Sequence, residues 1–183
     1  MRTMTLWQRL FVLALLLGGA WLVVSRIPPL PNADAVDAAL PAQPRAGFPA
    51  PDFEGQTLDG ETVRLTDFRG HPVVLNFWAT WCGPCRFEML AIERVAQAYA
   101  DRGLVVLLIN QGESPDAIRA FLQEMGVTQP VVLDNGAIGA KQYRVRGLPT
   151  TVFIHPDGMI EDVVVGGPMS EAFLEEKVQS ITP

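Results

Sequence analysis

The chain has 183 residues, enough for one compact domain and an appendage. Its formal net charge of −6 argues against nucleic acid as a partner, because nucleic acids select basic surfaces. It contains only two cysteines and two histidines, which disfavours a structural zinc site, since such sites use about four Cys, His or carboxylate ligands.

The first 27 residues predict a membrane-associated segment. An uncharged run rich in Leu, Val and Ala, Leu10–Ser25, lies between Arg9 and Arg26. A membrane-spanning helix needs about 20 apolar residues, and the segment reaches that length if both arginines snorkel to the interface. We therefore predict a retained signal anchor, or transmembrane helix, over residues 1–27. The alternative is a signal peptide that is cleaved after the small residues 18–20.

Charge predicts the orientation of this segment. Arginines precede it and the next charged residues after it are acidic, so the positive-inside rule keeps the amino terminus in the cytoplasm. We predict a single-pass protein of the inner (cytoplasmic) membrane whose domain faces the periplasm or, more generally, the extracytoplasmic side; cleavage would instead secrete it. Residues 28–45 are rich in Pro and Ala and predict a linker. Residues 46–183 are the predicted folded domain.

Short apolar runs then alternate with helical patterns, which predicts an α/β sheet with covered faces. Residues 56–65 predict a β-hairpin that turns at Asp59-Gly60. Further strands are expected at residues 72–78, 104–109, 131–133, 150–154 and 159–165. Helices are expected at residues 84–100, 115–125 (with Ser114 as N-cap), 136–143 and 170–180.

Two residues separate Cys82 from Cys85, the spacing of a reversible disulfide across the first turn of a helix. A buried strand is expected to end at Trp78, which places Cys82 at the amino end of the next helix. Unpaired N–H groups and the helix dipole stabilise a thiolate there. We expect Cys82 to be the exposed nucleophile and Cys85 the more buried resolving thiol. Pro84 suits the first helical turn, and Gly83 leaves room for a partner.

The segment Leu75–Cys85 resembles the active-site segment of thioredoxin-fold proteins, most closely the membrane-anchored TlpA/ResA-like (CcmG/DsbE-type) thiol-disulfide oxidoreductases. The resemblance extends over residues 46–183 and includes the turn Asp67–Gly70 and the later segment Tyr143–Thr151. It implies a thioredoxin-like fold with an N-terminal β-hairpin extension and a central strand–helix insertion. It also implies that the redox-active disulfide serves without a further cofactor.

The resemblance assigns residues around the disulfide. Pro149 is expected to follow a cis peptide bond and to lie against the disulfide. Leu148 is expected to offer its backbone to an extended substrate, as one strand pairs with another. Trp81 is expected to flank the substrate groove, whereas Trp78 is expected in the core.

Proton transfer is assigned to Glu88. Thioredoxins carry a buried acid at the position of Asn76, and an amide cannot act as a base. TlpA/ResA-like proteins carry an acid at the position of Glu88, three residues beyond Cys85 on a neighbouring helical face. The alternative for Glu88 is a solvated helix carboxylate. Leu90 departs from the family pattern, because many relatives have a helix-kinking proline there.

The Gly-Pro pair between the cysteines favours a reductant. Thioredoxin has the same pair, and its potential of about −270 mV lies about 150 mV below that of the oxidant DsbA. Expected substrates are exported proteins with disulfides, such as apocytochrome c during cytochrome c maturation or copper-site cysteines of an oxidase. The resemblance implies a membrane thiol-electron transporter as the electron source. The alternatives are a disulfide-forming oxidase and a Cu(I)-binding chaperone that uses both thiolates.

Overall fold

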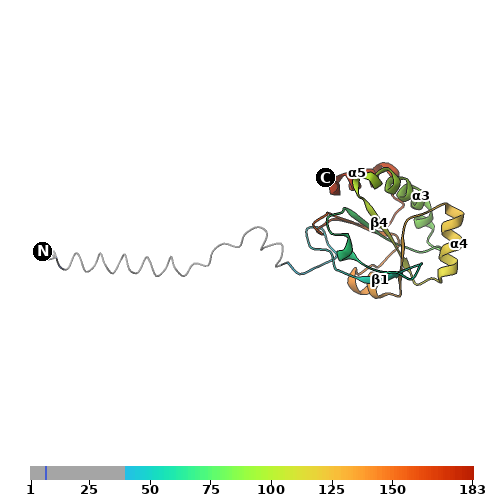
Figure 1. The fold of residues 1–183 in the computed structure, drawn as a ribbon, viewed down its shortest axis with the longest axis horizontal. Coiled ribbons are helices and arrows are strands. Elements are labelled where there is room, and N and C mark those ends of the chain that lie inside the picture. The colour runs from blue at the N-terminus through green and yellow to red at the C-terminus, as the bar shows by residue number, and fades with distance from the viewer. Residues whose placement is uncertain (1–6, 8–39) are drawn as a thin grey trace. The chain divides into compact units, whose positions relative to one another are not determined.

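A seven-stranded mixed sheet organises the compact unit Leu40–Pro183 (Figure 1). The computed structural model describes Trp7 and residues 40–183. In chain order the strands are β1 (Glu54–Thr57), β2 (Thr62–Arg64), β3 (Val73–Trp78), β4 (Val105–Gln111), β5 (Val131–Asp134), β6 (Thr150–Ile154) and β7 (Ile160–Val165). Across the sheet their order is β2-β1-β5-β4-β3-β6-β7.

Three helices pack on one face of this sheet: α3 (Gly83–Ala98), α4 (Pro115–Met125) and α5 (Glu171–Ile181). Strands β3, β4 and β5 are parallel neighbours, and the chain moves across them in one direction. Because such crossovers are right-handed, α3 and α4 lie on the same face. A second apolar cluster fills the other face, beneath the π-helix η3 (Ala137–Gln142) and the 3₁₀ turn η1 (Leu65–Phe68).

Strand β3 lies inside the sheet and every one of its residues is buried. Its side chains alternate between the two faces, so Val74 and Trp78 pack in the α3 cluster while Leu75 and Phe77 pack in the other. Trp78 is fully buried, which confirms its predicted place in the core. Asn76 is the polar exception and is also fully buried.

The predicted elements are confirmed with small shifts at their ends. The hairpin of β1 and β2 is antiparallel, and the Ser114 side chain caps α4 by accepting the N–H of Ala117 at 3.3 Å. The predicted helix 84–100 ends earlier, and a 3₁₀ turn, η2 (Ala100–Arg102), follows it. Leu90 lies inside the unbroken α3, so the helix has no interruption where relatives carry proline. The predicted helix 136–143 is the π-helix η3.

None of the helices in the described part of the chain combines the length and apolar character that a membrane crossing requires. The predicted anchor over residues 1–27, apart from Trp7, lies outside the described residues, as do residues 28–39 of the predicted linker. The predicted domain boundaries stay predictions.

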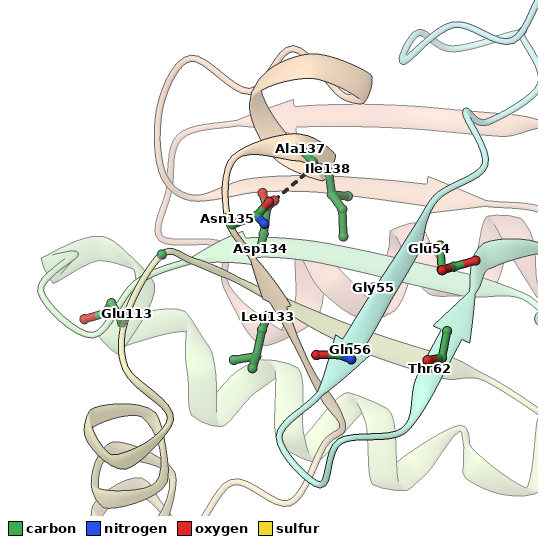
Figure 2. A pocket seen from close by; sticks show the side chains of 11 residues that line it. Glu54, Gly55, Gln56, Thr62, Glu113, Leu133, Asp134, Asn135, Ala137 and Ile138 are labelled. Carbon is green, nitrogen blue, oxygen red and sulfur yellow. Dashed lines mark hydrogen bonds between the residues drawn. The ribbon is translucent and has the colours of Figure 1, made fainter.

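Asp134 fixes the connection from β5 to η3. Its side chain is buried, and Oδ1 accepts the N–H groups of Gly136 at 2.8 Å and Ile138 at 3.0 Å. Figure 2 shows Asp134 and Ile138 joined in this way. The other oxygen, Oδ2, accepts the N–H of Gly139 and the Nε2 of Gln111, both at 2.7 Å. Each carboxylate oxygen thus satisfies two donors, as buried polar groups require.

Replacing Asp134 with asparagine is expected to destabilise the domain by about 2–3 kcal/mol. The new amide nitrogen would face hydrogen-bond donors, which leaves at least one of them buried without an acceptor. Urea unfolding followed by circular dichroism measures the change. The matched control is Asp101→Asn at an exposed position, expected to stay within about 0.5 kcal/mol of wild type. A D134N variant as stable as D101N would contradict the structural role of Asp134.

Candidate active site

The two cysteines form a disulfide at the amino end of α3, with an S–S distance of 2.05 Å. Cys82 is the N-cap of the helix, and its sulfur accepts the N–H of Cys85 at 3.3 Å. Unpaired N–H groups and the helix dipole favour negative charge at this position. Cys85 is fully buried, which confirms it as the more buried of the two residues. Cys82 is only 5% exposed, so it is itself largely buried and not exposed as predicted.

A groove of about 510 Å³ opens beside Cys82. The start of α3 and the loop before it contribute one wall, and this loop carries Trp81, a residue that is 72% exposed. The segment that precedes β6 contributes the other wall, which includes Val145, Arg146 and Leu148. The structure therefore brings the cysteine motif and the later family signature together, although Cys85 and Tyr143 are 58 positions apart in the sequence (143 − 85).

The peptide bond between Leu148 and Pro149 is cis, which confirms the prediction made from the resemblance. The carbonyl of Pro149 accepts the N–H of Gly166 at 2.8 Å, which ties this segment to the connection between β7 and α5. Within residues 40–183, neither the N–H nor the carbonyl of Leu148 has a hydrogen-bond partner. Leu148 thus presents a free backbone edge in the groove, as an added strand would require.

Glu88 is fully buried on α3, so the alternative of a solvated carboxylate is wrong. Its Oε1 accepts the Nδ2 of Asn76 at 2.9 Å, and its Oε2 accepts the N–H of Met169 at 3.0 Å. Burial raises the pKa of Glu88, and the hydrogen bonds from Met169 and Asn76 only partly oppose that shift. The result is a carboxyl group with an increased tendency to hold a proton.

Asn76 supports this carboxyl group from β3. Its Nδ2 also donates to the Thr151 hydroxyl at 2.9 Å, which links β3 to β6. Its Oδ1 is buried and has no hydrogen-bond partner among the described residues. Asn76 therefore holds the carboxyl group of Glu88 in place through a hydrogen bond and does not itself act as a base.

The backbone of Gly167 lies close to both Glu88 and Pro149. A Cβ on Gly167 would lie 2.7 Å from Oε2 of Glu88 and 2.9 Å from Cγ of Pro149. Contacts this short are not found for real Cβ atoms, so only glycine fits between the acid and the proline. Gly167 itself precedes a second cis bond, to Pro168, which sequence reasoning did not predict.

Sequence reasoning also missed Glu113, in the loop after β4. One carboxylate oxygen accepts the Thr80 hydroxyl, and the other accepts the Thr80 N–H at 2.7 Å and the Asn110 Nδ2 at 2.8 Å. Burial raises the pKa of Glu113, but these hydrogen bonds outweigh it and the pKa is lowered. Glu113 thereby fixes the loop in front of Trp81. It also lines a second pocket, of about 540 Å³, with Glu54 (Figure 2).

This arrangement is suited to thiol–disulfide exchange. It combines a sulfur at a helix amino end, a second sulfur within bonding distance, a buried carboxyl group and an open groove with free backbone groups. Throughout Trp7 and residues 40–183, no group of three or more His, Cys, Asp or Glu side chains is placed to hold a metal ion.

Known proteins are similar to this chain in sequence and in fold. Residues 46–163 match the family described as AhpC/TSA. The "thioredoxin-like protein YneN" of Bacillus subtilis is 42% identical over 135 residues, 72% of this chain and 78% of its own length. The "thiol-disulfide oxidoreductase ResA" of Geobacillus thermodenitrificans is 36% identical over 137 residues, 75% of this chain and 78% of its own.

A solved structure agrees with these relatives. The crystal structure of a thiol:disulfide interchange protein of the thioredoxin family from Chlorobium tepidum matches with a TM-score of 0.65 and 29% identity. The match covers 75% of this chain and 96% of that one. The fold is therefore thioredoxin-like, and the enzyme class is protein thiol-disulfide oxidoreductase. The chain belongs to the AhpC/TSA family, as a thioredoxin-like protein of the TlpA/ResA type.

Proposed function

We propose that this protein is an extracytoplasmic protein-disulfide reductase. One observation carries the proposal: the Cys82–Cys85 disulfide closes the amino end of α3 at an open groove, with the buried acid Glu88 one turn along the helix. The relatives named as thiol-disulfide oxidoreductases support the chemistry. The Gly-Pro pair between the cysteines supports the reducing direction, because thioredoxin has the same pair.

The reaction begins from the reduced dithiol. The Cys82 thiolate attacks one sulfur of the partner's disulfide, and the other partner sulfur leaves as a thiolate. The helix amino end stabilises the attacking thiolate, and its position on the groove makes it the accessible sulfur. Trp81 and Leu148 hold the partner as an extended segment during this step, with Leu148 providing the backbone hydrogen bonds and Pro149 fixing its position.

The second exchange releases the partner. Cys85 loses its proton and attacks Cys82, so that the second partner sulfur leaves and the Cys82–Cys85 disulfide forms. Two electrons thus pass from the protein to the partner. Glu88 accepts the proton of Cys85, because its raised pKa brings its basicity closer to that of a thiol.

The oxidised protein then needs a reductant. We assign that role to a membrane thiol-electron transporter, and the substrates to exported proteins such as apocytochrome c or copper-site proteins. A retained anchor over residues 1–27 would keep the domain close to the transporter. No cofactor beyond the two cysteines is required by this chemistry.

The equilibrium reduction potential of the Cys82–Cys85 pair tests the direction of electron flow. Equilibration of the full chain with glutathione or dithiothreitol redox buffers, followed by alkylation and mass spectrometry, gives the value. A reductant is expected near or below about −230 mV, in the range of thioredoxin and glutaredoxins. A value near about −120 mV would identify a disulfide-forming oxidase and overturn the proposal.

Single cysteine variants separate the two exchanges. Cys82→Ser is expected to reduce disulfide exchange to the uncatalysed rate, because the accessible nucleophile is lost. Cys85→Ser is expected to complete the first exchange and to accumulate a mixed disulfide between Cys82 and the partner. Non-reducing electrophoresis and mass spectrometry of the reaction with a peptide disulfide measure both outcomes. Accumulation in the Cys82 variant instead would reverse the two assignments.

Replacing Glu88 with glutamine is expected to slow the second exchange by roughly 10²-fold, because the proton acceptor for Cys85 is lost. The first exchange is expected to change much less. Rapid-quench measurement of the mixed disulfide separates the two rates, and the matched control is Glu61→Gln on the exposed end of the hairpin. Equal slowing of both exchanges would show that Glu88 acts only by packing.

Stability against pH provides a second readout for Glu88. A folded-state pKa above the ordinary carboxyl value of about 4.3 means that the native protein favours the protonated form. The resulting contribution of Glu88 to the unfolding free energy is fully present below the ordinary pKa. It is lost as the pH rises through the raised pKa. The unfolding free energy of wild type is therefore expected to fall relative to E88Q across this window.

A further inference from the structure

Arg146 places a single cation in the groove beside Cys82. Among the described residues that line this groove, it is the only one with a charged side chain. The Arg146 side chain is exposed and forms no ion pair with any carboxylate of residues 40–183. This unneutralised cation stands in a protein whose formal net charge is −6.

The two carboxylates described above, Glu88 and Glu113, already have other hydrogen-bond partners. Glu88 is fully buried and is held by Asn76 and Met169. Glu113 accepts hydrogen bonds from Thr80 and lines the other pocket. Arg146 is therefore available to a group on a partner.

The free backbone of Leu148 sets where that group would lie. A partner segment that pairs with Leu148 as a strand alternates its side chains between two directions, with a period of two residues. The wall itself bends at Gly147 and Leu148, so this period applies to the partner segment and not to the wall. Arg146 and Leu148 both line the groove, so the next partner side chain on the same face, two positions along, is the one placed to reach Arg146.

We propose that Arg146 selects partner segments with an acidic side chain two residues from the reactive cysteine. This inference rests on the proposed function, because it concerns the segment whose disulfide Cys82 attacks. The apolar surfaces of Trp81, Val145 and Leu148 receive the neighbouring side chain, while Arg146 pairs with the carboxylate. Selection acts at short range on the position of one acid, since the net charge of the protein repels acidic partners at long range.

The test uses peptide disulfides that differ in one residue. Each peptide carries one cysteine in a mixed disulfide with cysteamine, and Glu, Gln or Lys two positions before or two positions after that cysteine. The reduced full chain is mixed with each peptide in a single turnover. The protein gains its disulfide, and the peptide thiol and cysteamine are released. Each rate is divided by the rate at which dithiothreitol reduces the same peptide. This ratio removes the effect of the substitution on the peptide's own reactivity.

Wild type is expected to prefer Glu over Lys by about threefold to tenfold at low salt in one of the two peptide series. An exposed ion pair contributes about 0.2–1 kcal/mol, and like charges cost a similar amount. The ratio is expected to approach one at about 1 M salt, where the Debye length is about 3 Å. The Gln peptide is expected to react at an intermediate rate.

Variants assign the preference to one side chain. Arg146→Glu is expected to invert the Glu-to-Lys ratio, and Arg146→Gln to bring it near one. Arg144→Glu is the matched control, because Arg144 is exposed and lines a different pocket; this variant is expected to keep the wild-type ratio. Comparing ratios within each variant cancels any change in the reactivity of Cys82.

The outcomes distinguish a failure of the Arg146 proposal from a failure of the reductase proposal. A wild-type ratio near one in both series, or an R146E ratio equal to that of wild type, would overturn the role of Arg146 while leaving the reductase proposal intact. If none of the peptides, including Gln, is reduced while dithiothreitol reduces them all, the proposed function fails and this inference fails with it.

Discussion

The burial of one carboxyl group is the constraint on which the active site depends. Removing Glu88 from water is unfavourable for its ionised form, and the fold compensates with hydrogen bonds from two other elements. Asn76 donates from β3, and the N–H of Met169 donates from the connection between β7 and α5. Because Glu88 belongs to the same helix as the disulfide, these bonds also fix the position of α3 against the sheet.

The groove is built from loops that this framework holds in place. Glu113 binds both the N–H and the hydroxyl of Thr80, so the loop that carries Trp81 is attached to the end of β4. The opposite wall is attached through the carbonyl of Pro149, which pairs with Gly166. Each wall is therefore fixed by hydrogen bonds that lie outside the groove, which leaves the backbone of Leu148 free. Binding sites on rigid supports lose less entropy when a partner docks.

Local signals explain what could be predicted from the sequence. The apolar run of β3 and the N-cap Ser114 are local patterns, and the structure follows them. The position of Cys82 at the start of α3 follows from the same reasoning, because a strand, a short loop and a proline-started helix leave little choice. The cis bond before Pro149 came from resemblance, since composition alone carries no such information.

The features that sequence could not provide depend on contacts between distant segments. Glu113 looks like any loop glutamate, and only the fold reveals that it lies against Thr80. The burial of Glu88 requires the approach of Met169, which is 81 residues away. The π-helix that follows Asp134 depends on donors that converge on one side chain in three dimensions. Patterns of neighbouring residues do not encode such convergence.

Gly167 lies between the carboxyl group of Glu88 and the ring of Pro149. Because no side chain fits there, both groups pack against the same glycine, and a displacement of that glycine changes the packing of both. The environment of the acid and the position of Pro149 are therefore coupled in this protein. An engineer who alters the environment of Glu88 to change its basicity should find the affinity for extended segments changed as well.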